Sequence, residues 1–254
     1  MNIQLTWRLA RVVFHLVRGL ATCALVFPWA ATPLRERLVR RWSARLLAIC
    51  RVRVEHLPGT QSAVTPLAHA LVVSNHISWL DIFVINSLHP CRFVAKAEIR
   101  AWPVLGWLVA QAGTVFIARG NRRELRHIFQ GLVDALGQGQ RVAFFPEGTT
   151  ASQGRLLPFH ANLFEAAIDA RVPVQPYALA YVDTDGGWHP AVDYTGETTF
   201  VDSLLRILRS EPVVARLGYL HAIASEGAHR RELSAQARDA IAGALGALGA
   251  VEVE

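Results

Sequence analysis

Residues 71–81 read Leu71-Val72-Val73-Ser74-Asn75-His76-Ile77-Ser78-Trp79-Leu80-Asp81. The apolar run that begins this stretch predicts a buried strand, and the polar residues after it predict a break. Ser78 is a good N-cap for the apolar segment 79–88, which predicts a helix. We therefore expect the chain to pass from strand to helix here, with His76 on the loop between them.

His76 and Asp81 form the first candidate site. A histidine on a loop with a carboxylate at its ring is the usual arrangement for a general base. Ser78 and Asp81 also have the spacing of a capping box, in which Asp81 would serve only the helix terminus. These residues alone leave both interpretations open.

A second stretch has the same form. Residues 142–150 read Val142-Ala143-Phe144-Phe145-Pro146-Glu147-Gly148-Thr149-Thr150. The apolar start predicts another buried strand, which Pro146 ends. Gly148 then permits a backbone turn that other residues adopt with difficulty.

With these two stretches the chain resembles the glycerolipid acyltransferases typified by lysophosphatidic acid acyltransferase. That family has a histidine and an aspartate separated by four residues, and a Phe-Pro-Glu-Gly block. Two weaker family motifs match at residues 113–119 and 172–176. Four motifs in the family's order, over roughly residues 70 to 180, make the resemblance specific.

The resemblance implies transfer of a fatty acyl group from acyl-CoA or acyl carrier protein to a lysophospholipid hydroxyl, foremost 1-acylglycerol-3-phosphate, to give phosphatidic acid. His76 would be the general base, and Asp81 would hold its tautomer. Neither a metal nor a cofactor is expected. The predicted substrate-binding residues are Arg119, Glu147, Gly148, Thr149 and Arg155.

Two of these residues have more specific expectations. Arg119 matches the family's acceptor-binding arginine, and a guanidinium suits a phosphate. Glu147 is a carboxylate in an otherwise phosphate-binding region. It would orient Arg119 or bond a glycerol hydroxyl; the alternative is a solvated loop carboxylate.

The chain departs from the family pattern in two places. It has Thr150 where many relatives have arginine, reaching Arg155 only later, and His160 where relatives often have lysine. Another lysolipid, such as lyso-ornithine lipid, is therefore an alternative acceptor. A membrane-bound acyl thioesterase and an inactive membrane scaffold are alternatives from other classes.

The composition fits a domain with its own core that rests on a membrane. Of 254 residues, 52% are hydrophobic and 18% charged, with a net charge of +6. The basic charge suits anionic lipid or coenzyme A. Nucleic acid is not expected, because no zinc-ligand set and no RNA-binding signature is present. Three widely spaced cysteines suggest a reducing cytoplasm.

The N-terminal segment predicts the membrane contact. Residues 12–31 are long and apolar enough to span a bilayer, but Arg18 and Pro28 interrupt them. A spanning helix, a one-leaflet helix and a core helix remain open, and we expect an interfacial or one-leaflet anchor. The arginine-rich helix 34–50 would lie on the membrane surface or pack on the domain. The predicted location is the inner membrane, with the catalytic domain facing the cytoplasm.

The order of predicted elements gives the fold class. Strands are predicted at residues 51–55, 71–74, 91–95, 113–117, 141–145, 174–182 and 213–219, and helices at residues 34–50, 79–88, 102–111, 122–136, 161–170, 201–209 and 232–248. We expect an α/β fold with a central, mostly parallel sheet flanked by helices. Residues 1–50 would form membrane-anchoring helices, and residues 51–254 the acyltransferase domain.

Overall fold

The structure is a computed structural model that describes residues 3–60, 64–101, 105–117, 122–249 and 251–253. The α-helices are α1 (Ile3–Leu25), α2 (Thr32–Ile49), α3 (Leu80–Leu88), α4 (Leu105–Gln111), α5 (Arg122–Gly137), α6 (Glu165–Ala170), α7 (Phe200–Arg209) and α8 (Arg230–Gly246). Short 3-10 helices are η1 (Phe27–Trp29), η2 (Ala97–Ala101), η3 (Ala161–Phe164) and η4 (Pro190–Val192). The strands are β1 (Val52–His56), β2 (Leu71–Ser74), β3 (Arg92–Lys96), β4 (Val115–Ile117), β5 (Val142–Phe144), β6 (Arg155–Leu156), β7 (Val174–Val182), β8 (Val213–Tyr219) and β9 (Glu252–Val253).

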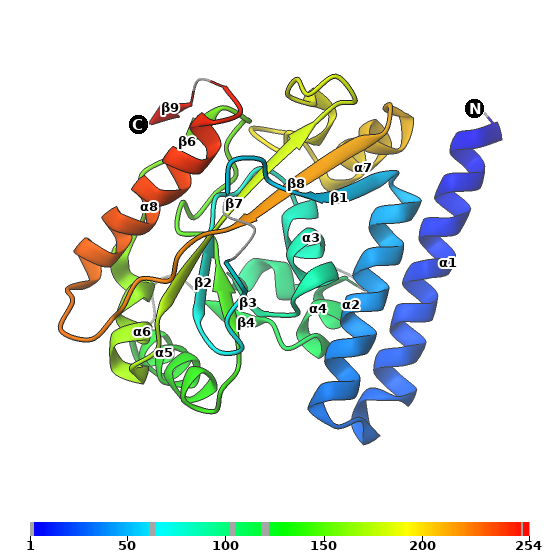
Figure 1. Cartoon of the computed structure of the whole chain (residues 1–254). Coiled ribbons are helices and arrows are strands. Elements are labelled where there is room, and N and C mark those ends of the chain that lie inside the picture. The colour runs from blue at the N-terminus through cyan, green and yellow to red at the C-terminus, as the bar shows by residue number, and fades with distance from the viewer. Residues whose placement is uncertain (1–2, 61–63, 102–104, 118–121, 250, 254) are drawn as a thin grey trace.

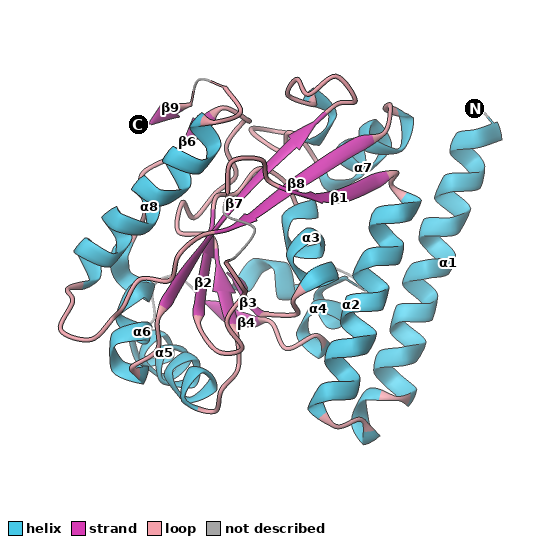
Figure 2. Cartoon of the chain, viewed as in Figure 1, coloured by secondary structure: helices cyan, strands magenta, loops and turns pink. Residues whose placement is uncertain are grey.

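The main sheet has seven strands in the order β1-β8-β7-β2-β5-β3-β4 (Figure 2). β7 and β8 pair antiparallel, whereas the other neighbours in this sheet pair in parallel. A separate pair joins β6 to β9. The predicted α/β class with a mostly parallel sheet is confirmed.

Helices cover both faces of the sheet, because alternate residues of each strand point to opposite sides. On β2, Val72 packs in the core under α1, α2, α3 and α7. Its neighbours Leu71 and Val73 pack in the core under α5, α6 and α8. Both faces of β2 are therefore buried, which explains its uninterrupted apolar run.

The predicted elements agree with the structure most closely in the sheet. β2, β7 and β8 have the predicted bounds, while the predicted strand 113–117 shortens to β4. The helix expected over residues 102–111 is seen from α4 onward, since residues 102–104 lie outside the described residues. The helix expected at 161–170 begins as the 3-10 turn η3.

α1 and α2 form an antiparallel hairpin at one edge of the molecule (Figure 1). α1 begins before the predicted apolar segment and ends at Leu25, and Pro28 lies in η1. The imidazole of His15 stacks on the indole of Trp42 with ring centroids 4.5 Å apart. A Cβ at Gly19 would lie 2.6 Å from the Trp42 Nε1, so the two helices can approach this closely only with glycine there.

α2 packs its apolar stripe on the domain, which is one of the two placements expected for this helix. Leu46 and Leu47 are buried in the main core, and Trp42 packs against the same core from its edge. α3 lies along the apolar stripe of α2. Each helix thereby buries its apolar side chains against those of the other. The arginines of α2 are exposed: Arg35, Arg37, Arg40, Arg41 and Arg45.

The predicted boundary at residue 50 falls between α2 and β1, but the main core crosses it. Leu5 and Val12 of α1 belong to the same core as Val72 of β2. Arg8 also donates to the carbonyl oxygen of Leu208 on α7 at 2.5 Å. The hairpin is thus joined to the α/β part by buried contacts.

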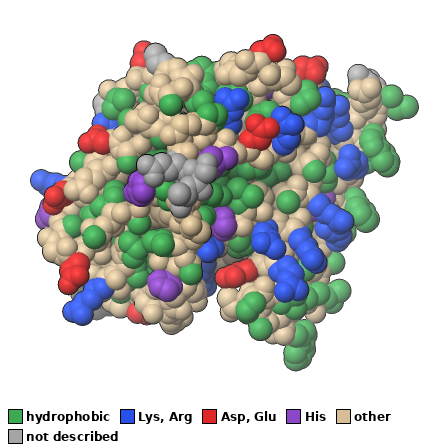
Figure 3. Space-filling model, in the orientation of Figure 1, with side chains coloured by type: hydrophobic (Ala, Val, Ile, Leu, Met, Phe, Trp, Pro, Cys, Tyr) green, Lys and Arg blue, Asp and Glu red, His purple; other side chains and the backbone are tan. Residues whose placement is uncertain are grey.

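The outer face of α1 is apolar and exposed. Ile3–Trp29 is long and apolar enough to cross a membrane, judged by length and composition, and 22% of its residues are buried. Trp7, Phe14 and Trp29 are 66%, 70% and 88% exposed. Figure 3 shows such side chains along the outer edge of the hairpin, beside a group of basic side chains.

Candidate active site

The two sequence motifs meet because their strands are neighbours. β2 and β5 pair in parallel, with Val73 opposite Phe144. Their carboxyl ends therefore lie at the same edge of the sheet, where α/β proteins usually bind ligands. The loop with His76 follows β2, and the loop with Glu147 follows β5.

His76 and Asp81 lie within hydrogen-bonding distance. The His76 Nδ1 is 2.7 Å from the Asp81 Oδ2. Because an ionised carboxylate only accepts hydrogen bonds, Nδ1 carries the proton in the neutral ring and Nε2 keeps its lone pair. The imidazole is 19% exposed, whereas the Asp81 side chain is fully buried.

Asp81 also closes the turn before α3. The N–H groups of Ile77 and Ser78 donate to its Oδ2 at 2.7 and 3.0 Å. The bond to Ser78 is the capping-box contact, so Asp81 contacts both the helix start and the imidazole ring. Ser78 itself is not the cap that we predicted, since its buried Oγ finds no partner among the described residues. α3 accordingly begins at Leu80, one residue later than expected.

Glu147 holds the two loops together. Its Oε1 accepts the backbone N–H of His76 at 2.7 Å, and its Oε2 accepts the backbone N–H of Leu157 at 3.0 Å. The residue is 4% exposed, so it is not a solvated loop carboxylate. Burial raises the pKa of Glu147 to about 7; the two N–H bonds and the charge of Arg238 oppose the rise, and Asp81 adds to it.

Phe145 fixes the plane of the imidazole. Its ring stacks on His76 with centroids 3.9 Å apart and an interplanar angle of 6°. Phe145 also stacks on Phe93 of β3, with centroids 5.7 Å apart. The ring therefore removes one face of His76 from water and aligns it in the site.

Two side chains that sequence reasoning missed tie the His76 loop to its surroundings. Asn75 forms paired hydrogen bonds with the backbone of Leu179 on β7, at 2.8 and 2.9 Å. Thr150 donates its hydroxyl to the carbonyl oxygen of Tyr194, whose N–H donates to Ile77 O at 3.2 Å. Only the position of Asn75 next to the histidine could have suggested its role.

The remaining predicted site residues are placed differently. Gly148 has φ of +69°, as expected for the turn, and it is exposed together with Thr149. Arg155 lies on β6, with its Nε 3.5 Å from the Glu252 Oε2. Arg119 lies outside the described residues. In the described part of the chain, no group of three or more His, Cys, Asp or Glu residues could hold a metal ion.

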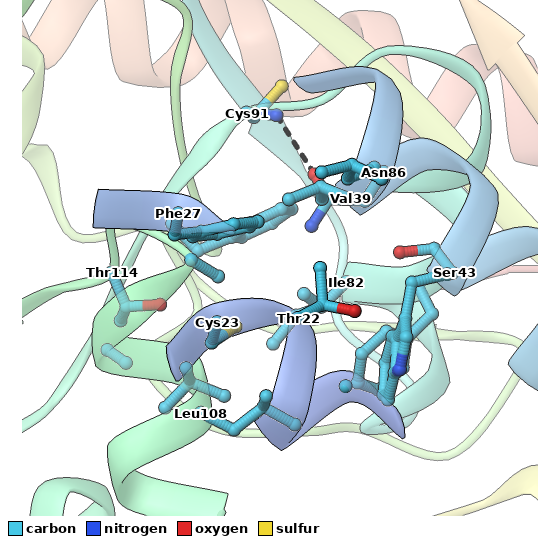
Figure 4. A pocket seen from close by; sticks show the side chains of 18 of the residues that line it. Thr22, Cys23, Phe27, Val39, Ser43, Ile82, Asn86, Cys91, Leu108 and Thr114 are labelled. Atoms are coloured by element: carbon cyan, nitrogen blue, oxygen red, sulfur yellow. Dashed lines mark hydrogen bonds between the residues drawn. The ribbon is translucent and has the colours of Figure 1, made fainter. Parts of the chain in front are cut away.

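An apolar cavity of about 130 Å³ lies between the hairpin and the sheet (Figure 4). Phe27 and Val39 border it on one side, and Cys23 and Leu108 on the other. Phe93 also lines it, and the ring of Phe93 stacks on Phe145, which in turn stacks on His76. α1, α2, α3 and α4 all contribute to its walls.

Comparisons with known proteins agree on one family. The family model described as Acyltransferase matches residues 54–180. The chain is 39% identical over 250 residues to a lyso-ornithine lipid O-acyltransferase of Pseudomonas aeruginosa, covering 96% of this chain and 94% of that protein. It is 50% identical over 116 residues to a 1-acyl-sn-glycerol-3-phosphate acyltransferase of Neisseria gonorrhoeae, covering 46% of each.

The fold is also found in a solved structure. The crystal structure of the 1-acyl-sn-glycerophosphate acyltransferase PlsC from Thermotoga maritima superimposes with a TM-score of 0.66 at 18% identity. The match covers 97% of this chain and 95% of that one. Together with the sequence matches, this likeness supports the resemblance suggested by the His76 and Glu147 motifs. This chain belongs to the acyltransferase family.

Proposed function

We propose that this acyltransferase moves a fatty acyl group from a thioester, acyl-CoA or acyl carrier protein, to the free hydroxyl of a lysolipid at a membrane surface. The observation that carries the proposal is the pairing of His76 with the buried Asp81 at 2.7 Å. That pairing leaves the His76 Nε2 free to accept a proton.

In the proposed reaction, Nε2 takes the proton from the acceptor hydroxyl while its oxygen attacks the thioester carbon. The carbon–sulfur bond breaks, and the proton passes from His76 to the departing thiolate. Thiols have a pKa of about 8.5, so the thiolate leaves readily without a metal. Asp81 stabilises the imidazolium that forms in between.

Donors for the oxyanion are proposed from the loop after Glu147. The N–H groups of Ile77 and Ser78 are already donated to Asp81, and that of Gly148 to Phe145 O. Within the described residues, the N–H groups of Thr149 and Thr150 have no acceptor. They are the candidates to hold the developing negative charge.

The apolar cavity is the proposed site for the acyl chain. Phe93 in its wall stacks on Phe145, which stacks on His76, and the half-buried apolar side chains of Ile82 and Phe83 on α3 also line it. An alkyl chain placed there would leave water, which favours binding in proportion to the apolar area covered.

For the acceptor we propose lyso-ornithine lipid first, because the Pseudomonas relative that carries this name matches nearly the whole chain. The second candidate is 1-acylglycerol-3-phosphate, because the Neisseria relative is more similar over a shorter region. Arg119 remains the predicted contact for an anionic head group, with Thr149 and Arg155 as further candidates. Glu147 is the weaker candidate for a head-group contact, since both of its oxygens accept backbone N–H groups.

Product analysis tests the proposal. Purified protein with labelled acyl-CoA should acylate lyso-ornithine lipid, and the ratio to the rate with lysophosphatidic acid identifies the preferred acceptor. His76→Ala should abolish the product without unfolding the protein. Release of free fatty acid alone would indicate a thioesterase, and no turnover of any acceptor would indicate an inactive scaffold.

Membrane attachment is assigned to the exposed face of α1 (Figure 3). Replacing Trp7, Phe14 and Val17 by serine should release the protein from anionic vesicles yet preserve activity on detergent-dispersed acceptor. Deleting residues 1–50 is a poorer test, because it would remove Leu46 and Leu47 from the core. Vesicle binding equal to that of the wild type would contradict this assignment.

A further inference from the structure

Tyr181 of β7 contacts the candidate catalytic pair, although no step above uses it. The residue is fully buried, and its hydroxyl donates to the Asp81 Oδ1 at 2.7 Å. Its backbone N–H donates to the Gln153 Oε1, also at 2.7 Å. The tyrosine is therefore held by the sheet and by a neighbouring loop, with its hydroxyl directed at the carboxylate.

The two oxygens of Asp81 differ in what they contact. Oδ2 accepts from the His76 ring and from the N–H groups of Ile77 and Ser78. Among the described residues, Oδ1 accepts only from Tyr181. Without that hydroxyl, a buried and charged oxygen would lose its donor, and the carboxylate could turn about its Cβ–Cγ bond.

We infer that Tyr181 is a positioning residue: its hydroxyl holds the Asp81 carboxylate so that Oδ2 faces His76, and it sets the pH range in which His76 acts as a base. This inference rests on the proposed function, since it concerns the same reaction. The physical reason is that a donor at Oδ1 draws negative charge away from Oδ2. The carboxylate then holds the imidazole proton less tightly.

The same strand offers a matched control. Tyr177 lies four residues earlier on β7, is also fully buried, and belongs to the same core. Its hydroxyl has no hydrogen-bond partner among the described residues. Tyr177→Phe and Tyr181→Phe therefore remove the same atom from the same strand, but only the second removes a donor to Asp81.

Several charged or titratable groups lie near the pair and are the same in all variants. Glu147 accepts from the backbone of His76, and Arg238 of α8 donates to the carbonyl oxygen of Leu157, whose N–H donates to Glu147. His160 lies over Gly148, and Asp193 accepts the backbone N–H of Gln153. Their contributions cancel when the pH profile of Tyr181→Phe is compared with that of Tyr177→Phe.

The test is kcat/KM for acyl transfer between pH 5 and 9. Tyr181→Phe should lower kcat roughly tenfold, the size expected for one lost hydrogen bond to a charged group. It should also move the acidic limb of the profile to higher pH by about half a unit to one unit, as Asp81 then attracts the imidazole proton more strongly. KM for both substrates and the whole profile of Tyr177→Phe should stay near the wild type.

A second substitution should shift the pH profile in the opposite direction. Incorporating 3-fluorotyrosine at position 181 keeps the ring shape and makes the hydroxyl a stronger donor, so the acidic limb should move to lower pH. This variant also decides the question if Tyr181→Phe does not fold. The inference would be overturned if the acidic limb of the pH profile lay at the same pH in the wild type and in the variants at position 181. The proposed function would still hold in that case, provided that the wild type transfers acyl groups and His76→Ala does not. An inactive wild type would instead overturn the proposed function.

Discussion

Asp81 and Glu147 are two buried carboxylates that both contact His76, and they differ in what they bind. Asp81 accepts from four donors, including the His76 ring and the Tyr181 hydroxyl. Glu147 accepts two backbone N–H groups, one of them from His76. One carboxylate contacts the ring that would take the proton, and the other contacts only the backbone that carries this ring.

This difference separates two roles that the sequence motifs present side by side. Asp81 is surrounded by donors, which is the environment that a buried carboxylate needs when it pairs with an imidazolium. Glu147 has fewer donors, and burial raises its pKa to about 7. It therefore serves to join the loops after β2 and β5, and its charge depends on pH in the neutral range.

The largest expected effect tests whether Asp81 is the partner of the His76 ring during the reaction. In Asp81→Asn, an NH2 group replaces one of the two carboxylate oxygens. This group donates hydrogen bonds, so it would face another donor, either the His76 Nδ1–H or the Tyr181 hydroxyl. By analogy with a hydrolytic triad, kcat should fall about 10⁴-fold. Steady-state acyl transfer measures the loss, and circular dichroism checks the fold. Activity within tenfold of the wild type would remove Asp81 from the mechanism.

Titration of Glu147 gives an intermediate effect. Its folded pKa of about 7 lies above its ordinary value of 4.5. The stability that it contributes is therefore fully present below pH 4.5, falls as pH rises from there to about 7, and then stays level. Relative to Glu147→Gln, which cannot ionise, the wild type should lose up to about 3 kcal/mol of unfolding free energy over this window.

Urea unfolding of both proteins at several pH values measures this difference. Asp193, whose pKa burial also raises, titrates in both proteins and cancels in the comparison. If the unfolding free energies of the wild type and of Glu147→Gln change in parallel from pH 4.5 to 8, Glu147 ionises as an ordinary carboxylate. The contrast with Asp81 would then rest on hydrogen bonds alone.

The smallest effect concerns Ser78. An N-cap serine typically contributes about 1 kcal/mol, but here the Ser78 Oγ has no partner among the described residues and caps no helical N–H. Ser78→Ala should therefore change the unfolding free energy by less than about 0.5 kcal/mol. Thermal or urea unfolding suffices as a measurement. A loss near 1 kcal/mol would mean that the hydroxyl caps α3 after all.

The helices, the strands and the kind of chemistry of this protein could be predicted from its amino-acid sequence. Strands and helices follow from local periodicity, so β2, β7 and β8 could be predicted to the residue. The pairing of His76 with Asp81 was one of two interpretations that these residues left open, and the family resemblance implied it; the structure contains both the pairing and the capping contact. The family could be suggested from the same two motifs.

Which distant residues meet became visible only in the folded chain. Glu147 reaches the N–H of His76 because β5 is the neighbour of β2, and Tyr181 reaches Asp81 because β7 is the other neighbour. The hairpin shows the same limit: α2 turned its apolar stripe to the core, and α1 kept one exposed. Such choices depend on strand order and on the free energy of covering one apolar face with another, which no local pattern of residues records.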